Sequence, residues 1–395
     1  MYQEIKIGIF SGKVPSTTFV ENLIIGLSKN FIVHVYGRQY KNVNYQSRNI
    51  KLFTIPNSRI SRVIFFLKML LQSLFFSKKH LFNHLKKIKT FPFYRKILNL
   101  ERVLPIINHP PDILHFQWVS SIQLLENYRG NFKTVLSLRG SQINMNPVFF
   151  KSTRNKNIKH FKNISGFHAV SDDIKKISRN CIEKHKKIKV IRPAINEINL
   201  KLSNRSWKYK NNEKLKIISV GVNRWKKGYT YSLDAIKLLV DKNIQFSYTI
   251  IAPGRDDENI NYQIDNLKLS EYVNYISGMP HQQALKKIKN SHLLLLPSLS
   301  EGIANVVLES MSLGVPVLST NCSGMGEVIT NNVNGFLVPP RSPKKIALKI
   351  NDIINLNNTS MSKIINAAKD TIVKNHLISN QVKDFKSLYY DILNE

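Results

Sequence analysis

The feature that most constrains the fold is the alternation of short apolar runs with segments of helical periodicity. In the first half of the chain, apolar runs occupy residues 4–10, 31–37, 111–119, 134–140, 166–170 and 189–194. Segments with apolar residues at helical spacing occupy residues 20–30 and 172–181. Short buried strands that alternate with helices predict a parallel sheet with helices on both faces.

The alternation restarts after a polar stretch at residues 202–214. Further apolar runs occupy residues 216–222, 247–253, 272–277, 292–298, 316–320 and 335–340, with helical segments at 231–243, 281–290 and 303–314. Because 395 residues are too many for one core, we predict an α/β protein with two facing Rossmann-like domains, residues 1–200 and 213–375. Ligands of such sheets bind outside the carboxyl ends of the strands, so the chemistry is expected in a cleft between the domains.

The charge of the chain is large and unevenly distributed. Lys and Arg number 59 against 25 Asp and Glu, a net charge of +34, of which residues 1–200 carry +25. Residues 51–100 hold eleven basic side chains and no acidic one. Such a field attracts anionic lipid, nucleic acid or phosphorylated substrates. A general bias toward lysine would raise the charge everywhere, so it explains only part of this distribution.

Residues 61–89 interrupt the strand–helix pattern of the first half. The apolar run at 63–76 is broken by Lys68, Gln72 and Ser73, and it is shorter than the roughly 20 apolar residues that span a bilayer. Two interpretations of its apolar face stay open: the face lies in a lipid interface, or it packs on its own sheet or over the cleft. The basic face of the segment is expected to contact anionic headgroups.

The chain shows few signs of a bound cofactor. Cys181 and Cys322 belong to no CxxC pair or histidine cluster, so a reduced compartment and no zinc site are expected. The sequence has no GxGxxG, no P-loop and no Asp-x-Asp pair, and neither a cofactor nor a metal is predicted. The N-terminus lacks the basic-then-apolar pattern of a signal peptide, which predicts a cytoplasmic protein.

The most informative segment is residues 292–320. A buried strand ends at Pro297, a polar loop holds Glu301 and Gly302, and a helix is expected from near Ile303. The N–H groups of Ile303, Ala304 and Asn305 at the start of that helix, together with its dipole, suit a diphosphate.

Two glutamates in this segment are eight positions apart, Glu301 before the helix and Glu309 within it. Their separation of about 12 Å along a helix suits the two ends of a sugar-diphosphate-nucleoside better than the two sides of one scissile bond. One carboxylate would then accept from sugar hydroxyls and the other from the ribose diol. Taken alone, such a pair also arises by chance, with one glutamate solvated and the other buried.

The order strand, Pro-Ser, Glu-Gly, helix, small-Gly-x-Pro, strand resembles glycosyltransferase family 4, the retaining GT-B enzymes that use nucleotide-activated sugars. The similar segments are PSLSEG (297–302), the Glu301/Glu309 pair, SLGVPVLSTNCSGMGEVI (312–329) and NGFLVPP (334–340). The resemblance implies the GT-B fold, with a last helix at 376–395 that crosses back to the first domain. It also implies transfer with retention and without a metal, Glu301 at the donor sugar and Glu309 at the ribose.

Residues 219–236 are similar to the family's phosphate-binding turn, with Lys227 and Gly228 at its end. Lys227 would contact the diphosphate and neutralise the charge that develops on the leaving group. The family usually has arginine directly after the first glycine, where this chain has Val222. Arg224 is a candidate for the missing guanidinium; alternatively, Arg224 and Lys226 belong to a surface basic run.

In the first domain, residues 13–27 resemble the opening of capsule and exopolysaccharide members of the family. Gly12 and a helix capped by Ser16 or Thr17 would then meet acceptor or phosphate, although an ordinary helix cap explains these residues equally well.

Two further strands of the first domain, at 111–118 and 138–144, resemble family segments in which Gln117 and Arg139 replace histidines. Both are therefore candidates for positioning the acceptor rather than for proton transfer. His115 and His168 are expected to be core residues, and no catalytic histidine is assigned.

The predicted function is transfer of a sugar from a nucleotide-sugar donor to a hydroxyl of a lipid-linked or polysaccharide acceptor in cell-surface glycan synthesis. We expect it on the cytoplasmic face of a membrane with an anionic surface. The alternatives are a GT-B sugar-nucleotide epimerase or hydrolase, and a basic nucleic-acid-binding protein. No nucleic-acid partner is expected, because the sequence has no zinc finger, RNP-like strand or basic helix-turn-helix.

Overall fold

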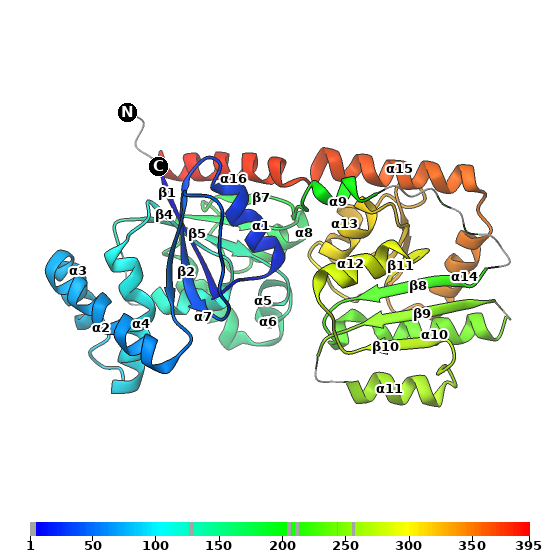
Figure 1. Cartoon of the computed structure of the whole chain (residues 1–395), viewed down its shortest axis with the longest axis horizontal. Coiled ribbons are helices and arrows are strands. Elements are labelled where there is room, and N and C mark those ends of the chain that lie inside the picture. Colours follow the sequence, from blue (N-terminus) through cyan, green and yellow to red (C-terminus); the bar gives the residue numbers. More distant parts are fainter. Residues whose placement is uncertain are drawn as a thin grey trace. The chain divides into compact units, whose positions relative to one another are not determined.

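The computed structural model describes residues 5–125, 130–203, 207, 209, 213–242, 244–254 and 257–395. The chain forms two compact units (Figure 1). The first comprises Met1–Ile191 and Ile378–Glu395, and the second comprises Arg192–Leu377. The polar stretch at 202–214 lies partly outside the described residues, but its Trp207 and Tyr209 are buried in the core of the second unit.

The first unit is built on a seven-stranded sheet in the order β3-β2-β1-β4-β5-β6-β7, with every neighbouring pair parallel. Its strands are β1 (Lys6–Val14), β2 (Ile32–Gln39), β3 (Ile50–Ile55), β4 (Ile113–Phe116), β5 (Lys133–Leu138), β6 (Gly166–Ala169) and β7 (Ile188–Val190). The apolar runs of the sequence correspond to all of these strands except β3. That edge strand was missed because its first half is largely exposed and contains Lys51, so it lacks a continuous apolar run.

Helices cover this sheet and extend beyond its edge. They are α1 (Thr18–Leu27), α2 (Arg59–Phe76), α3 (Lys78–Lys87), α4 (Phe93–Asn108), η1 (Val119–Leu125), α5 (Ser141–Asn144), α6 (Asn146–Phe149), α7 (Lys151–Phe161), α8 (Asp172–Ser178) and α16 (Ile378–Leu393). The last helix, α16, packs on α1: a Cβ atom on Gly26 would lie 2.7 Å from the Val382 side chain. Phe385 and Tyr389 of α16 are completely buried in the core, so the end of the chain is part of the first unit.

A chain of buried hydrogen bonds connects α16 to the sheet. The Tyr389 hydroxyl lies 2.7 Å from His115 Nδ1, His115 Nε2 lies 2.9 Å from Ser137 Oγ, and Ser137 Oγ lies 2.8 Å from His168 Nδ1. His168 Nε2 bonds to the Ile191 carbonyl oxygen at 2.8 Å. Because that carbonyl can only accept, every bond of the chain is oriented from Tyr389 toward Ile191.

Burial keeps both histidines of this chain neutral. It lowers the pKa of His115 to about 3 and the pKa of His168 well below its ordinary value. With both ring nitrogens engaged, neither side chain is available for proton transfer. The prediction that they are satisfied core residues is confirmed.

Replacing Tyr389 with phenylalanine removes one donor and leaves a buried nitrogen of His115 unpaired. We expect Tyr389→Phe to lower the free energy of unfolding by about 1–3 kcal/mol, measured by urea denaturation. Tyr390→Phe is the matched control, because Tyr390 is 41% exposed and its hydroxyl makes no hydrogen bond among the described residues. Equal stability of the two variants would contradict this role of Tyr389.

The segment at 61–89 forms two helices, α2 and α3, that meet at Ser77 with a bend of 114°. Met69, Leu81, Leu100 and Leu104 from α2, α3 and α4 form a small core of their own. The segment therefore packs on α4 through one face only. A set of large apolar side chains on α2, α3 and α4 is exposed: Ile60, Val63, Ile64, Leu67, Leu71, Leu74, Phe75, Phe76, Phe82, Phe93, Tyr94, Ile97 and Leu98.

The helices of the described residues can be compared with the length and apolar composition that a bilayer requires. No single helix there is both long and apolar enough to cross a bilayer. By length and composition α2 and α3 would suffice together, but the sharp bend separates them.

The second unit contains a six-stranded parallel sheet in the order β10-β9-β8-β11-β12-β13. Its strands are β8 (Leu215–Val220), β9 (Phe246–Ile251), β10 (Val273–Ile276), β11 (Leu293–Leu296), β12 (Val317–Thr320) and β13 (Phe336–Val338). All six correspond to predicted apolar runs. The central strand β11 is four consecutive buried leucines, as expected for a strand covered on both faces.

The helices of the second unit lie on both faces of its sheet, with one apolar cluster on each side. They are α9 (Ile198–Lys201), η2 (Trp225–Lys227), α10 (Tyr229–Val240), α11 (Asp257–Asn266), α12 (His281–Lys289), α13 (Asn305–Ser312), η3 (Ser323–Glu327), α14 (Pro343–Ile354) and α15 (Asn358–Asn375). Each unit is thus a parallel sheet between helices. The predicted α/β class with two Rossmann-like domains is confirmed.

Candidate active site

Two loops of the second unit meet at the carboxyl ends of the neighbouring strands β8 and β11. After η2, Gly228 has a φ of 66°, in the left-handed region. A Cβ atom here would collide with the carbonyl oxygen of Pro297, the residue after β11, so glycine permits the close approach. The Leu299 N–H donates to the Lys226 carbonyl oxygen at 2.7 Å. Packing and a main-chain hydrogen bond therefore join the two loops.

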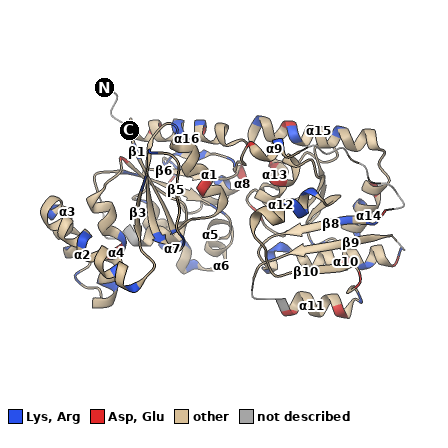
Figure 2. Ribbon diagram, in the orientation of Figure 1, with Lys and Arg blue, Asp and Glu red and all other residues tan. Residues whose placement is uncertain are grey.

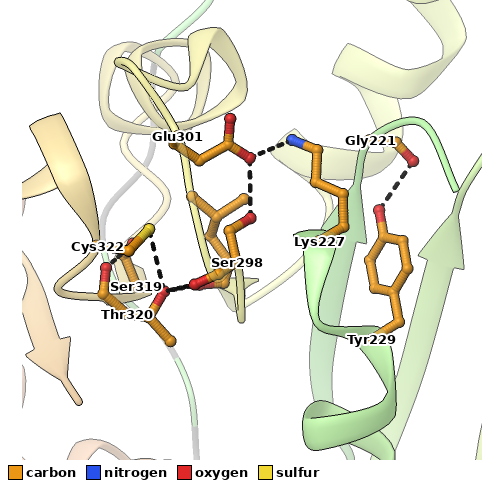
Figure 3. A network of polar contacts seen from close by, with 9 residues as sticks. Gly221, Lys227, Tyr229, Ser298, Glu301, Ser319, Thr320 and Cys322 are labelled. Carbon is orange, nitrogen blue, oxygen red and sulfur yellow. Dashed lines mark hydrogen bonds and ion pairs between the residues drawn. The ribbon is translucent and has the colours of Figure 1, made fainter. Parts of the chain in front are cut away.

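An ion pair between Lys227 and Glu301 crosses this junction (Figure 3). Lys227 Nζ lies 2.5 Å from Glu301 Oε1, and the Ser298 hydroxyl donates to the same oxygen at 2.9 Å. The two charged side chains are only 15% and 10% exposed. Because Oε1 accepts both bonds and Oε2 has no partner among the described residues, the second oxygen of Glu301 remains available to a ligand.

The position of Lys227 depends on Gly221 and Tyr229. The Tyr229 hydroxyl donates to the Gly221 carbonyl oxygen at 2.8 Å, and Figure 3 shows the Lys227 amine directed to Glu301. A Cβ atom on Gly221 would lie 2.9 Å from Lys227 Cε. The aliphatic part of Lys227 therefore lies against backbone that has no side chain, and any larger residue at 221 would displace it.

The other side of Glu301 is supported by the end of β12. The Thr320 hydroxyl donates to the Ser298 carbonyl oxygen and also contacts Cys322 Sγ at 3.6 Å (Figure 3). Burial raises the pKa of Cys322 to about 11, so its thiol stays protonated at neutral pH. These residues hold the loop of Glu301 in place and are buried beneath it.

The helix after Glu301 begins slightly later than expected. Gly302, Ile303 and Ala304 precede α13, whose first residue is Asn305, with Ala304 at the N-cap position. The first N–H groups of an α-helix lack partners within it and lie at the positive end of its dipole. In addition, Oδ1 of Asn305 is buried without a hydrogen-bond partner. The start of α13 thus offers donors to an anion and one free acceptor to a hydroxyl or N–H group.

Glu309 has a partner that sequence reasoning missed. His281, the first residue of α12, places Nε2 2.8 Å from Glu309 Oε1. The hydrogen bond to Glu309 raises the pKa of His281 above its ordinary value. Glu309 and Glu301 form no contact with each other, and each is fixed by a basic partner of its own. A lone histidine at the start of a helix carries no sequence pattern that would have indicated this pair.

Arg224 lies apart from this cluster. Its side chain is exposed, lines a separate cavity of about 520 Å³ with Trp225 and Tyr231, and makes no hydrogen bond or ion pair with the side chains of Glu301 and Lys227. Only its carbonyl oxygen contacts Lys227, from which it accepts the N–H at 2.8 Å. Lys226 is the nearer cation: burial lowers its pKa, and the negative charge of Glu301 opposes that shift. Lys226 was open to interpretation as a surface residue, but it is only partly exposed.

In the first unit, the structure places Gly12 at an irregularity of β1 with a φ of 81°. Thr17 occupies the N-cap position of α1, but its side chain makes no capping hydrogen bond. Instead, the Ser16 N–H donates to Glu21 Oε1 at 2.6 Å, and Tyr45 donates to the other oxygen of Glu21. The expected side-chain cap is therefore wrong, and the carboxylate of Glu21 instead fixes the residue before the N-cap position.

Gln117 and Arg139, which follow the neighbouring strands β4 and β5, contact each other. Arg139 Nη2 donates to Gln117 Oε1 at 3.1 Å, and its guanidinium lies 4.7 Å from the ring centre of Phe19. Burial lowers the pKa of Arg139 to about 9. Arg139 Nε and Gln117 Nε2 are buried without hydrogen-bond partners. Two unpaired buried donors suit a ligand with acceptor oxygens.

Residues 203–371 match the family model of "Glycosyl transferases group 1". The matched residues make up most of the second unit. The match covers the Lys227–Glu301 pair, α13 and His281, and it confirms the resemblance seen in the sequence. The first unit lies outside the matched residues.

Individual relatives share the same part of the chain. The amylovoran biosynthesis glycosyltransferase AmsK of Erwinia amylovora is 31% identical over 169 residues, which are 41% of this chain and 40% of that protein. The UDP-Gal:alpha-D-GlcNAc-diphosphoundecaprenol alpha-1,3-galactosyltransferase of Escherichia coli is 28% identical over 173 residues, 41% of this chain and 42% of the relative. The chain thus spans less than half the length of these curated relatives.

Solved structures extend the similarity of fold to the whole chain. HepE of Anabaena, crystallised with UDP and glucose, has a TM-score of 0.67 and 14% identity over 98% of this chain and all of that chain. The predicted GT-B fold is therefore confirmed.

The His281–Glu309 pair has a measurable consequence. We expect the pKa of His281, followed by NMR of labelled imidazole, to lie above its ordinary value in the wild type and to fall in Glu309→Gln, because the hydrogen bond to a carboxylate is lost. Stability from the pair is fully present below the unfolded pKa of about 6.5 and is lost as pH rises through the raised folded pKa.

The control for this measurement is Glu327→Gln, which removes a carboxylate that pairs with Arg192 instead. It should leave the His281 titration unchanged. A His281 pKa that does not respond to Glu309→Gln would show that the pair does not form in solution.

Proposed function

We propose that the protein is a retaining glycosyltransferase that moves a sugar from a nucleotide-sugar donor to a hydroxyl of a lipid-linked or polysaccharide acceptor in cell-surface glycan synthesis. The observation that carries this proposal is the Lys227–Glu301–Ser298 cluster beside the start of α13, inside a group 1 domain. The names of two relatives support it, since one names amylovoran biosynthesis and the other names a UDP-sugar and a diphosphoundecaprenol substrate.

In this proposal, the donor diphosphate lies between Lys227 and the start of α13. An ammonium group has three N–H donors, of which Glu301 takes one, so two remain for phosphate oxygens. The helix start adds main-chain N–H groups and a dipole of favourable sign. Together they supply positive charge to the leaving group as its bond to the sugar breaks.

Glu301 and Glu309 hold the two ends of the donor. The free Oε2 of Glu301 accepts from sugar hydroxyls, and its negative charge stabilises the positive charge that develops at the anomeric carbon. Glu309 accepts from the ribose diol through the oxygen that His281 leaves free. Both carboxylates are fixed by basic partners before the donor arrives, so little reorganisation is needed on binding.

The bond from the anomeric carbon to the diphosphate oxygen breaks, and the acceptor oxygen forms its bond on the same face of the sugar. The proton of the acceptor hydroxyl passes to the departing diphosphate. This route needs no protein base, which suits a chain whose His115 and His168 are buried and engaged. We assign no step to a metal ion, since Lys227 and α13 provide positive charge.

Activity assays of two variants test the site. Lys227→Ala and Glu301→Ala should each reduce transfer at least tenfold, which is about 1.4 kcal/mol or more of transition-state stabilisation. A panel of nucleotide sugars, screened for thermal stabilisation of the wild type, identifies the donor for this assay. EDTA is expected to leave the wild-type rate unchanged.

Lys237→Ala is the matched control, because Lys237 pairs with Asp241 on the surface of α10. It should transfer sugar at the wild-type rate. Wild-type rates in both site variants would remove the assigned roles, and donor turnover that never needs an acceptor would favour an epimerase or hydrolase.

We also propose that the protein binds the cytoplasmic face of an anionic membrane through α2, α3 and α4. Phe75 and Phe76 at the end of α2 are 79% and 84% exposed, and Lys78 and Lys79 follow after Ser77. Lys and Arg recur along these helices (Figure 2). An exposed apolar face bordered by lysines suits an interface of acyl chains and anionic headgroups.

Liposome flotation tests this contact. Replacing Phe75 and Phe76 together with serine should weaken binding to anionic vesicles roughly tenfold or more, because two large apolar side chains no longer leave water. Tyr262→Ser, at a 73% exposed position on α11, is the control and should bind as the wild type does. Equal recovery of the wild type with neutral and anionic vesicles would rule out the electrostatic part.

A further inference from the structure

A cavity of about 680 Å³ lies entirely within the first unit. Its walls come from the carboxyl ends of β1, β2 and β3 and from α2, α4 and η1. Parallel sheets bind ligands at this end of their strands. The volume is within the usual range for a small-molecule site. The residues of the Lys227–Glu301 cluster do not contribute to it.

The walls of this cavity are strongly basic. Five cationic side chains line it, and they come from four different elements or loops: Lys13, Arg38, Arg62, Arg95 and Arg102. Glu101 is the one carboxylate among the lining residues. This cavity therefore concentrates part of the positive charge that distinguishes the first half of the sequence.

Both oxygens of the single carboxylate, Glu101, already accept hydrogen bonds. Arg62 Nε and Nη2 donate to the two oxygens of Glu101 at 2.7 and 2.6 Å, and the Glu101 side chain is only 8% exposed. This bidentate pair fixes the Arg62 guanidinium in the wall. It leaves four positive charges in the cavity without an acidic partner among the described residues.

Arg38 carries an unpartnered donor of this cavity. Arg38 lies in β2 next to Gly37, and both residues line the cavity. The Nε atom of Arg38 is buried without a hydrogen-bond partner. A buried donor without a partner costs about 1–3 kcal/mol. The Tyr40 ring lies 5.7 Å from the Arg38 guanidinium and 5.0 Å from Lys13 Nζ, and a ring supplies no acceptor oxygen.

The cavity has open space for an anionic group beside Gly12. Gly12 lines it with a φ of 81°, and a Cβ atom there would meet no atom within 4 Å. Ser120, Ser121 and Gln123 of η1 add polar side chains to the lining. Unpaired guanidinium groups around open space are a setting for phosphate oxygens.

The surroundings of the cavity are apolar as well as basic. Phe91 and Leu98 line it, and Phe93 and Ile97 on the same stretch of chain are exposed. The apolar face of α2 and α4 therefore continues from the cavity wall. A molecule with an anionic group and a long apolar chain matches this combination.

We infer that the cavity binds the diphosphate of a lipid-linked acceptor, with the lipid chain along the exposed faces of α2 and α4. The inference rests on the proposed function for the identity of the acceptor, and a diphosphate-lipid acceptor appears in the name of one relative. The residues of the cavity bind and position the acceptor, and none of them is assigned a bond-breaking role.

The test uses the full chain and a double variant, Arg38→Gln with Arg102→Gln. Arg62 is left unchanged, because its removal would leave buried Glu101 unpaired and destabilise the fold. The control is Arg48→Gln with Arg154→Gln, which removes the same charge at exposed positions of the first unit outside the cavity. Binding is measured by calorimetry with farnesyl diphosphate, farnesol and inorganic pyrophosphate as probes.

We expect farnesyl diphosphate to bind the wild type and the control equally and the cavity variant at least tenfold more weakly, about 1.4 kcal/mol. Farnesol should bind all three proteins weakly. Pyrophosphate that binds as tightly as farnesyl diphosphate would show a site for free phosphate and overturn the lipid assignment. Unchanged affinity of the cavity variant would overturn the cavity as the site.

The same proteins separate this inference from the proposed function. Stabilisation by the nucleotide sugar should be equal in all three, because the donor residues belong to the second unit. The expected farnesyl diphosphate results without any sugar transfer would support the cavity and reject the transferase. Sugar transfer with the same acceptor KM in the cavity variant and the control would support the transferase and reject the cavity as the acceptor site.

Discussion

The candidate active site depends on the close approach of two loops, those that follow β8 and β11. Gly228 in its left-handed conformation lies against Pro297, and the Leu299 N–H bonds to Lys226. Only this approach allows Lys227 and Glu301, 74 positions apart in the sequence, to form a 2.5 Å ion pair. A buried pair of this kind is costly to form and costly to break. Its role is to hold a carboxylate and an ammonium group beside a helix start.

The two units divide the physical tasks of the protein. In the second unit, the carboxylates of the candidate site, Glu301 and Glu309, each have a basic partner. The first unit holds most of the net positive charge, and its basic cavity adjoins helices with exposed apolar faces. Such a division suits an enzyme whose donor is a soluble anion and whose acceptor is an anion attached to lipid.

Much of the fold followed from apolar runs, because strands buried on both faces must be apolar along their whole length. The edge strand β3 was missed for the same reason, because its exposed half contains Lys51, which interrupts the apolar run. Glu301, Lys227 and Glu309 were predicted as site residues from motif order. His281 was not, since one histidine at a helix start has no distinctive spacing. Lys226 was open to interpretation as a surface residue because it stands in a run of basic residues, and the sequence does not distinguish the partly buried side chain from the exposed ones.

The sequence by itself determined two parallel α/β sheets, an acidic loop before a helix and a surplus of positive charge in the first half, because periodicity, motif order and composition are local properties. Only the tertiary structure decided which cations have partners. Arg62 meets Glu101 across 39 positions, whereas Arg38 keeps a buried donor unpaired. Such distinctions depend on distances of a few ångströms between segments remote in the chain, and packing alone sets those distances.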